Sequence, residues 1–275
     1  DLTQWETGNV QNMPFLFNGA RAFDQPLNAW DTGNAKSMRN MFADAHKFNQ
    51  PLNDWNTSAV TDMSGMFLNA GAFNQDLGAW ANKLAQLTTM ENMFKSASAF
   101  NNGAVPGAGG RPLNWETPAV QKMNYAFAYA TAFNQQIFAD GASTPNVTNM
   151  SAMFKGATAF NQNIGGWNTE SVTDTKLMFQ DATAFNQDIG SWSMGGVTNM
   201  SAMFKDAKVF NQDLSGWAIG SAAIDFSSFD EGADAWCGLG FSNRGRPGAV
   251  SPSKAESCAL NLVIDAPESV VAGDQ

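Results

Sequence analysis

Large apolar side chains recur along the chain at a fixed interval. Tryptophan stands at Trp5, Trp30, Trp55 and Trp80, each 25 residues after the last. The same step separates Trp167, Trp192 and Trp217, and phenylalanine follows it at Phe23, Phe48, Phe73, Phe160, Phe185 and Phe210. Self-similarity at such a period predicts a repeat protein, in which each unit buries its apolar faces against its neighbours.

Two elements are predicted within one repeat. Residues 63–73 place apolar side chains at Met63, Met66, Phe67, Ala70 and Phe73, the spacing of a short amphipathic helix. Serine falls where such a helix would be capped, at Ser64, Ser151 and Ser201. The next segment, FNQDLGAW, contains a glycine and, in other units, an early proline, which disfavour a helix. We therefore expect a short strand at about residues 75–77 and an α/β repeat.

The period stretches in the middle of the chain. The step from Trp80 to Trp115 is 35 residues, and Asp140 stands where the next tryptophan is expected. Most of the extra length is the Gly/Pro-rich stretch 102–112, which predicts a surface loop. The two tyrosines of the chain, Tyr125 and Tyr129, follow this loop. Because tyrosine is enriched at interfaces, they are candidate ligand-binding residues.

Composition narrows the class of function. With 15 basic and 25 acidic residues the net charge is −10, which argues against nucleic acid and anionic lipid as partners. There is no run of 18 apolar residues, so no membrane insertion is expected. The chain begins inside a repeat, and we interpret it as a mature or excised segment.

Catalysis has little support in the sequence. The single histidine, His46, takes a position that other units fill with Gly71, Thr158 or Lys208, which is typical of an exposed residue. A Ser-His-Asp set would need a second histidine, and no Gly-rich phosphate-binding motif is present. We therefore expect no enzyme activity.

The repeat pattern M-S-x-M-F…F-N-Q…W, seen at residues 63–80, 150–167 and 200–217, resembles that of BspA-like leucine-rich-repeat proteins of bacterial surfaces. The resemblance covers about residues 5–230. It implies a right-handed leucine-rich-repeat-type solenoid of about eight to nine coils. It also implies a role in attachment or protein interaction at the bacterial cell surface, without catalytic residues.

The repeat ends near residue 230, and the two cysteines, Cys237 and Cys258, follow it. We expect residues 1–230 to form the solenoid and residues 231–260 to form a C-terminal cap, since a terminal coil must be sealed. A disulfide between the cysteines fits an oxidising, extracellular setting, whereas a zinc site would need more ligands. Residues 261–275 resemble a linker to a following immunoglobulin-like module.

Polar residues also repeat. The asparagine of each F-N-Q triplet is expected to point inward and hold turn backbone, because buried amides need partners. The residues after it are expected to line the strand face and to bind ligand: Gln162, Gln187, Asp188, Gln212 and Asp213. Stacked strands lie about 4.8 Å apart, so Asp188 and Asp213 would repel each other unless a cation intervened. Calcium there is a weak alternative that needs more oxygen ligands, and no other cofactor is expected.

Three functions follow from these patterns. The favoured one is a non-catalytic extracellular adhesion domain that recognises a protein or glycan on another cell or host surface through its strand face. The second is a structural spacer between neighbouring modules of the same polypeptide. The third is ice or mineral binding through a regular threonine row, made of Thr7, Thr32, Thr57, Thr117 and Thr169.

Overall fold

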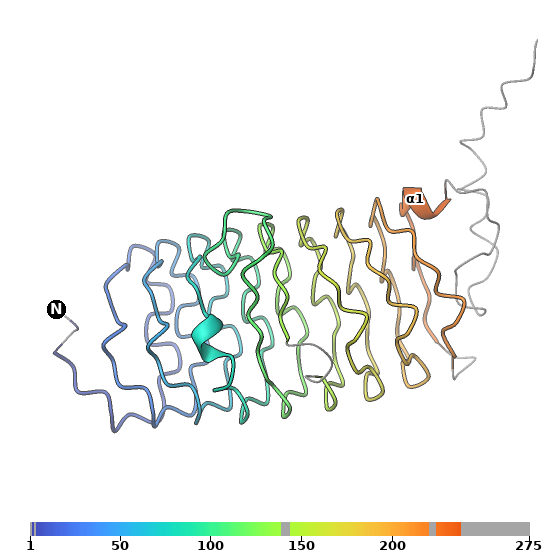
Figure 1. The fold of residues 1–275 in the computed structure, drawn as a ribbon. Helices are drawn as coiled ribbons and strands as arrows, with labels where there is room; N and C mark the ends of the chain where they lie inside the picture. Colours follow the sequence, from blue (N-terminus) through green and yellow to red (C-terminus); the bar gives the residue numbers. More distant parts are fainter. Residues whose placement is uncertain (1, 3, 139–143, 220–223, 238–275) are drawn as a thin grey trace, which may run out of the picture.

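The computed structural model describes residues 2, 4–138, 144–219 and 224–237. The chain winds through them as a single row of stacked coils (Figure 1). The helices of the described part are short: the 3-10 helix η1 covers Gly78–Trp80 and the α-helix α1 covers Asp234–Cys237. No helix among these residues is long and apolar enough to cross a membrane. Cys258, most of the expected cap and the expected linker 261–275 lie outside the described residues.

Consecutive coils are joined by backbone hydrogen bonds along one side of the row. Met38 N–H donates to Asp62 O at 2.9 Å, and Asn40 N–H donates to Ser64 O at 2.8 Å. Isolated parallel bridges mark this ladder at Asn12, Ser37, Asp62, Thr89, Lys122, Asn149, Asp174, Asn199 and Asp225. We call the segments that carry it the turn side: 11–23, 36–48, 61–73, 88–100, 121–133, 148–160, 173–185, 198–210 and 224–236. The remaining segments form the loop side.

The prediction of a helix at residues 63–73 and at the equivalent residues of other repeats is wrong. On the turn side, N–H groups that bond to the next coil alternate with N–H groups that close four-residue β-turns, such as Met41 N–H to Met38 O at 3.1 Å. The backbone also takes the left-handed conformation twice in a coil, at Asn40 (φ 51°) and Asp44 (φ 57°). A right-handed helix cannot include such residues. Consecutive turns therefore bury the apolar side chains whose spacing had predicted a helix.

The predicted strand and helix caps also differ from the structure. Residues 74–77 form neither strand nor bridge, and the ladder runs instead through Asp62 and its equivalents. Ser64 does not cap a helix: its Oγ and its N–H donate to Asp62 Oδ1 at 2.6 and 2.8 Å. Ser151 and Ser201 repeat this arrangement with Asn149 and Asn199. These serines fix a bend just after each bridge.

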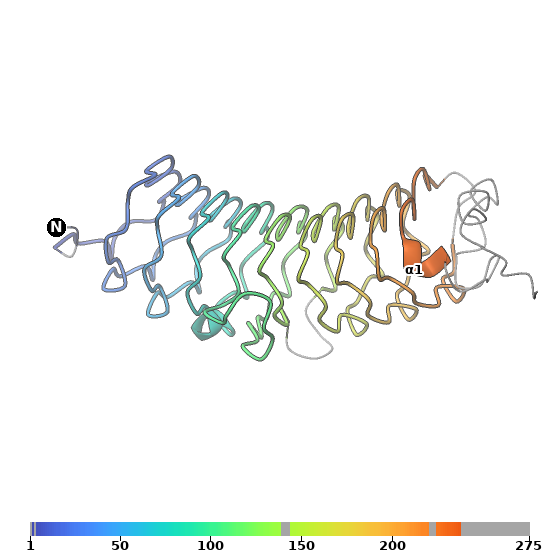
Figure 2. The same cartoon turned by 90° about the horizontal axis from the view of Figure 1, so that it is seen from above.

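The core that the repeat predicted is present. Met63, Met66, Phe67, Ala70 and Phe73 are fully buried. The two phenylalanines of a coil stack on each other and on those of the next coil, as in Phe42–Phe48 (centroids 4.0 Å apart) and Phe48–Phe73 (5.9 Å). These ring ladders continue through the described coils, and the row that they support is curved (Figure 2).

The buried tryptophans add a polar contact to the core. The indole N–H of Trp55 donates to Leu27 O of the preceding coil at 2.9 Å. The same bond joins Trp30 to Leu2, Trp80 to Leu52, Trp115 to Leu77, Trp192 to Ile164 and Trp217 to Ile189. Each of these rings therefore both fills the core and satisfies a backbone carbonyl.

The last described coil carries α1. Trp236 takes the place of the second phenylalanine of a repeat and packs edge-on against Phe204 and Phe210, with centroids 5.7 and 5.1 Å away. The bridge between Asn199 and Asp225 brings this coil into the ladder. The repeat thus extends beyond residue 230 to at least Trp236.

Candidate binding surfaces

The F-N-Q asparagines form a continuous hydrogen-bonded row on the loop side. Asn161 Oδ1 accepts the backbone N–H of Asn186 at 2.9 Å, and Asn186 Oδ1 accepts that of Asn211 at 2.8 Å. The row extends back through Asn134, Asn101, Asn74 and Asn49 to Asp24. The expectation that these residues hold backbone is confirmed, but the backbone N–H groups of this row belong to the next asparagine and not to a turn.

The three glutamines expected to bind ligand belong to this row. The side-chain N–H groups of Gln162, Gln187 and Gln212 each donate to Oδ1 of the row asparagine in the preceding coil, at 2.8–2.9 Å. All three side chains are half-buried. The side-chain amide N–H groups of these glutamines therefore link consecutive coils, and each already has a hydrogen-bond acceptor within the protein.

Asp188 and Asp213 are exposed, as expected of a binding surface. Asp188 Oδ1 accepts Gly190 N–H and Asp213 Oδ1 accepts Ser215 N–H, each at 2.9 Å. Hydrogen bonds from the Ser215 hydroxyl and then its N–H hold the pKa of Asp213 below its usual value. Each carboxylate thus closes a local turn through one oxygen.

The glycines beside these aspartates are required by packing. A Cβ on Gly165 would lie 2.6 Å from Asp188 O, and one on Gly190 would lie 2.8 Å from Asp213 O. Glycine here lets adjacent coils approach closely. The described residues contain no group of three or more His, Cys, Asp or Glu side chains able to share a metal ion. The weak calcium alternative at Asp188 and Asp213 therefore gains no further protein ligand.

Charge is divided unequally between the two sides. On the loop side the acidic residues that the structure describes are all exposed: Glu6, Asp24, Asp31, Asp54, Asp76, Glu116, Glu170, Asp188 and Asp213. Within the described residues, the basic ones on this side are Lys83 and Arg111, and Arg111 Nη1 lies 3.6 Å from Asp76 Oδ2. The turn side carries the other described lysines and arginines, mixed with acids. This division of charge was not predicted from the sequence. The sequence does contain a signal for it, because lysine and arginine fall mostly between the Met and Phe positions of a repeat.

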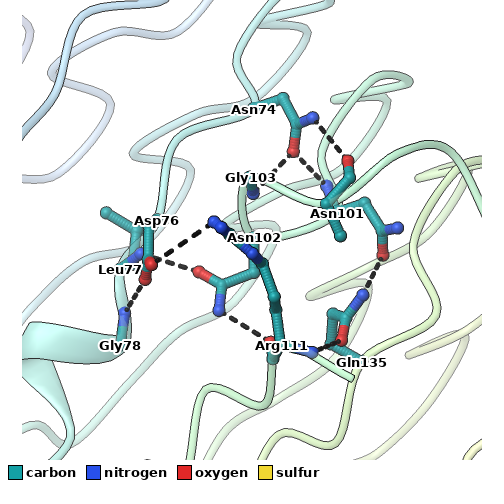
Figure 3. Close-up of polar contacts among 10 residues, drawn as sticks. Asn74, Asp76, Leu77, Gly78, Asn101, Asn102, Gly103, Arg111 and Gln135 are labelled. Carbon is teal, nitrogen blue, oxygen red and sulfur yellow. Dashed lines mark hydrogen bonds and ion pairs between the residues drawn. The ribbon is translucent and has the colours of Figure 1, made fainter. Parts of the chain in front are cut away.

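The insertion 101–112 is folded onto the loop side by its own amides (Figure 3). Asn102, which is 1% exposed, accepts Leu77 N–H at 2.7 Å and donates to Arg111 O at 2.8 Å. Arg111 N–H donates to Gln135 Oε1 at 2.8 Å. The buried Asn101 donates to the loop carbonyls of Val105 and Ala108. The predicted surface loop is confirmed, and it is fixed at both ends.

The tyrosines lie on the turn side, away from the acidic residues of the loop side. Tyr125 is half-buried, and Tyr129 is 40% exposed. Lys95 Nζ lies 4.8 Å from the Tyr125 ring centroid, and Lys155 Nζ lies 5.8 Å from that of Tyr129. The seven candidate ligand-binding residues were predicted from the sequence as one set. The structure separates the two tyrosines from the five Gln and Asp candidates, which lie on the loop side.

Two further sequence expectations concern exposure. The threonine row proposed for ice or mineral binding is buried, with Thr57 fully enclosed and its hydroxyl donating to Lys83 O at 3.1 Å. That row offers no platform to a crystal surface. His46 is exposed as expected, on a turn rather than a helix, with Nε2 3.9 Å from Asp44 Oδ1.

The turn side also has a shallow polar hollow. Its lining includes Arg39, Asp62, Glu91 and Lys122, with serine, threonine and glutamine between them. Charges of both signs and no large apolar side chain line it. Sites for small molecules are usually enclosed and largely apolar, so this hollow does not suit one.

The chain matches the model of a known protein family. The model of the family described as "Mycoplasma protein of unknown function, DUF285" matches residues 1–106, 111–140 and 139–236. These stretches together cover the repeat region. The comparisons with curated proteins and with solved structures gave no match.

Proposed function

We propose that this chain, which belongs to the repeat family described as Mycoplasma protein of unknown function, DUF285, is a non-catalytic binding module that recognises a macromolecular partner through its loop side. The observation that carries the proposal is the exposed acidic row on that side, in which the described basic residues are Lys83 and Arg111. A surface whose charged residues are mostly acidic attracts an oppositely charged, extended partner. A basic segment of another protein has the required charge and length.

The finer classification is part of the same proposal. The M-S-x-M-F…F-N-Q…W pattern supports a place among BspA-like leucine-rich-repeat proteins and a right-handed solenoid of that type. That relationship supports an adhesin on the outside of a bacterial cell. A disulfide between Cys237 and Cys258 would fit the same location. The partner would then be a protein or glycan on another cell or host surface.

The architecture supports surface recognition over catalysis. The described side chains form regular rows, and the polar hollow on the turn side is shallow and of mixed charge. Long shallow surfaces suit extended partners, because an enclosed pocket is needed to desolvate a small substrate. The Asn–Gln row provides a rigid backing, so that the carboxylates are held in place before binding.

Binding of a defined basic probe tests the proposal. We expect a fluorescent 20-residue poly-lysine peptide to bind the protein, with an affinity that falls as salt is added. Replacing Asp188 and Asp213 together by Asn should weaken binding several-fold. The matched control is Asp181→Asn with Asp206→Asn on the turn side, which should change it little. Equal loss from both pairs would show that net charge alone drives binding and would reject the loop-side assignment.

A spacer is the second candidate, and the unbroken ring ladders favour it. Stacked phenylalanines such as Phe67–Phe94 and Phe94–Phe127, each 5.3 Å apart, continue from coil to coil and make the row stiff. A stiff rod would hold neighbouring modules of the same polypeptide apart. If a broad screen of basic proteins and glycans yields no partner, the spacer function is the better account.

A further inference from the structure

Two tyrosines occupy backbone positions that disfavour them. The left-handed corners of the turn side are filled in the preceding coils by Asn40, Gly65 and Asn92 at the first corner and by Asp44, Asn69 and Ser96 at the second. In the coil 121–133 both corners are tyrosine, Tyr125 at φ 58° and Tyr129 at φ 59°. Elsewhere in the described coils a bulky residue takes a left-handed corner at Phe15 and Leu177, one in each coil. Bulky left-handed residues are strained, and such strain gathers at functional sites.

The next coil is adapted to the second tyrosine. A Cβ on Gly156 would lie 2.5 Å from Tyr129 Cδ1 and 2.8 Å from Cε1. The Tyr129 ring therefore lies against the backbone of the following coil, which only glycine leaves room for. Lys95 from the coil before and Lys155 from the coil after lie over the two rings. Each tyrosine ring thus lies beside a lysine ammonium group, Lys95 at Tyr125 and Lys155 at Tyr129, within three consecutive coils.

Charge around this surface differs from that of the molecule. In the three coils 88–100, 121–133 and 148–160 the turn side carries Glu91, Lys95, Lys122 and Lys155. None of these three lysines forms an ion pair with another described residue. By contrast, Lys205 pairs with Glu231 at 3.4 Å and Lys208 with Asp206 at 3.0 Å. A locally positive patch therefore lies on a chain whose net charge is −10.

The insertion borders the same patch. Gly107 N–H donates to Ala132 O at 2.9 Å, three residues after Tyr129, and Gly107 O accepts Asn134 Nδ2 at 2.8 Å. Val105, at the tip of this loop, is 69% exposed. The longest interruption of the repeat thus contacts the coil that carries both tyrosines.

We propose that Tyr125, Tyr129, Lys95 and Lys155 bind an acidic saccharide, one that carries carboxylate or sulfate groups. Aromatic rings at an exposed surface accept the apolar C–H face of a sugar ring, and the ammonium groups form charge-assisted hydrogen bonds with its anionic group. Coils stack about 4.8 Å apart, so Lys95 and Lys155, two coils apart, would contact groups about 10 Å from each other. That separation calls for an oligosaccharide rather than a single sugar.

An acidic peptide is the competing ligand, and the geometry favours it less. A bound peptide usually pairs its backbone with a free sheet edge. Here the backbone N–H groups of Tyr125 and Tyr129 already donate to Ser151 O and Lys155 O of the next coil, at 2.9 and 2.6 Å. Side chains alone are left to make contacts, which suits the hydroxyls and ring faces of a sugar.

Binding of defined oligosaccharides to the whole chain tests the proposal. The probes are an oligogalacturonate and a sulfated oligosaccharide, with neutral maltoheptaose and an oligo-glutamate peptide for comparison. We expect both acidic saccharides to bind and the other two to bind at least tenfold more weakly. Equal binding of oligo-glutamate would overturn the saccharide assignment, as would the absence of acidic saccharide binding at millimolar concentration.

Matched variants locate the site. Tyr125→Asn with Tyr129→Ser introduces the residues that the coil 88–100 has at the same corners, so the fold should be kept. We expect saccharide affinity to fall about tenfold or more. Lys95→Gln with Lys155→Gln should act similarly, and Lys205→Gln, in the same row but paired with Glu231, should not. Unchanged affinity in the tyrosine variant would reject the site.

This inference rests on the proposed binding role, but its failure is distinguishable from failure of that role. The Asp188→Asn, Asp213→Asn variant should lose affinity for poly-lysine and keep affinity for the acidic saccharide. The tyrosine variant should do the reverse. Loss of both ligands in either variant would indicate a global change in the fold and would contradict two separate sites.

Discussion

Asn161 Oδ1 accepts the backbone N–H of Asn186, one repeat later, at 2.9 Å. The same oxygen accepts the side chain of Gln187, so one carbonyl group fastens two residues of the next coil. The relationship recurs along the loop side, and it explains why the F-N-Q triplet is part of the repeat. It also makes the stack sensitive to the loss of a single amide.

Asn161→Ala should lower the free energy of unfolding by about 1–3 kcal/mol, because two half-buried donors lose their acceptor. Urea denaturation followed by tryptophan fluorescence measures the change. Asn161→Asp is the matched control, since Asp24 Oδ1 already accepts Asn49 N–H and Gln50 Nε2 at 2.9 and 3.0 Å. If the alanine variant is no less stable than the aspartate variant, the row does not carry stability.

Trp192→Phe should cost roughly 2–4 kcal/mol, since it removes both ring volume and the indole N–H that donates to Ile164 O at 3.0 Å in the core. Thermal and urea unfolding both report it. Trp5→Phe is the comparison, because Trp5 is 53% exposed and its replacement should change stability by less than about 0.5 kcal/mol. Similar losses at the two positions would contradict the assigned role of the indole N–H.

Gly190→Ala should destabilise the stack by about 1–3 kcal/mol, because the new Cβ would meet Asp213 O of the next coil at 2.8 Å. Differential scanning calorimetry measures the shift in melting temperature. Gly166→Ala is a fair control, since no atom lies within 4 Å of its Cβ position. A neutral Gly190→Ala would mean that the coils are not packed as closely as this contact requires.

Ser215→Gly should raise the pKa of Asp213 toward its ordinary value, because the hydroxyl hydrogen bond is lost and the backbone N–H bond is kept. NMR titration of the carboxyl carbon measures this pKa. A lowered folded pKa stabilises the protein above the unfolded value of about 3.8, and the stabilisation is lost as pH falls through the folded pKa. The wild-type chain should thus lose this contribution at lower pH than the variant does. A pKa that does not move would exclude the hydroxyl as the main cause.

Mass spectrometry of the unreduced protein should find no free thiol at Cys237 and Cys258. The disulfide would close a loop of about 20 residues and, in the chain-entropy model, contribute roughly 3 kcal/mol. Reduction should therefore lower the melting temperature. Two thiols that react with an alkylating reagent in the native protein would contradict the oxidised cap.

The repeat and its core were predictable from the sequence by itself. The period follows from Trp30, Trp55 and Trp80, and the apolar spacing of Met63 to Phe73 identified side chains that are all fully buried. The inward asparagine row followed from the rule that a repeated buried amide must find partners. The insertion at 102–112 was visible as an interruption rich in glycine and proline. These features depend on side-chain chemistry and spacing, which the sequence states directly.

The backbone path was decided by the tertiary structure. The spacing of Met63, Met66 and Phe67 fits a helix and consecutive turns equally well, and the choice depends on N–H groups that bond to the next coil, 26 residues away. Which polar residues remain free was decided in the same way. Gln187 is occupied by Asn161, whereas Tyr129 meets Lys155 because Gly156 leaves room for its ring. Contacts between residues a full repeat apart determine these outcomes, and a pattern within one repeat does not contain them.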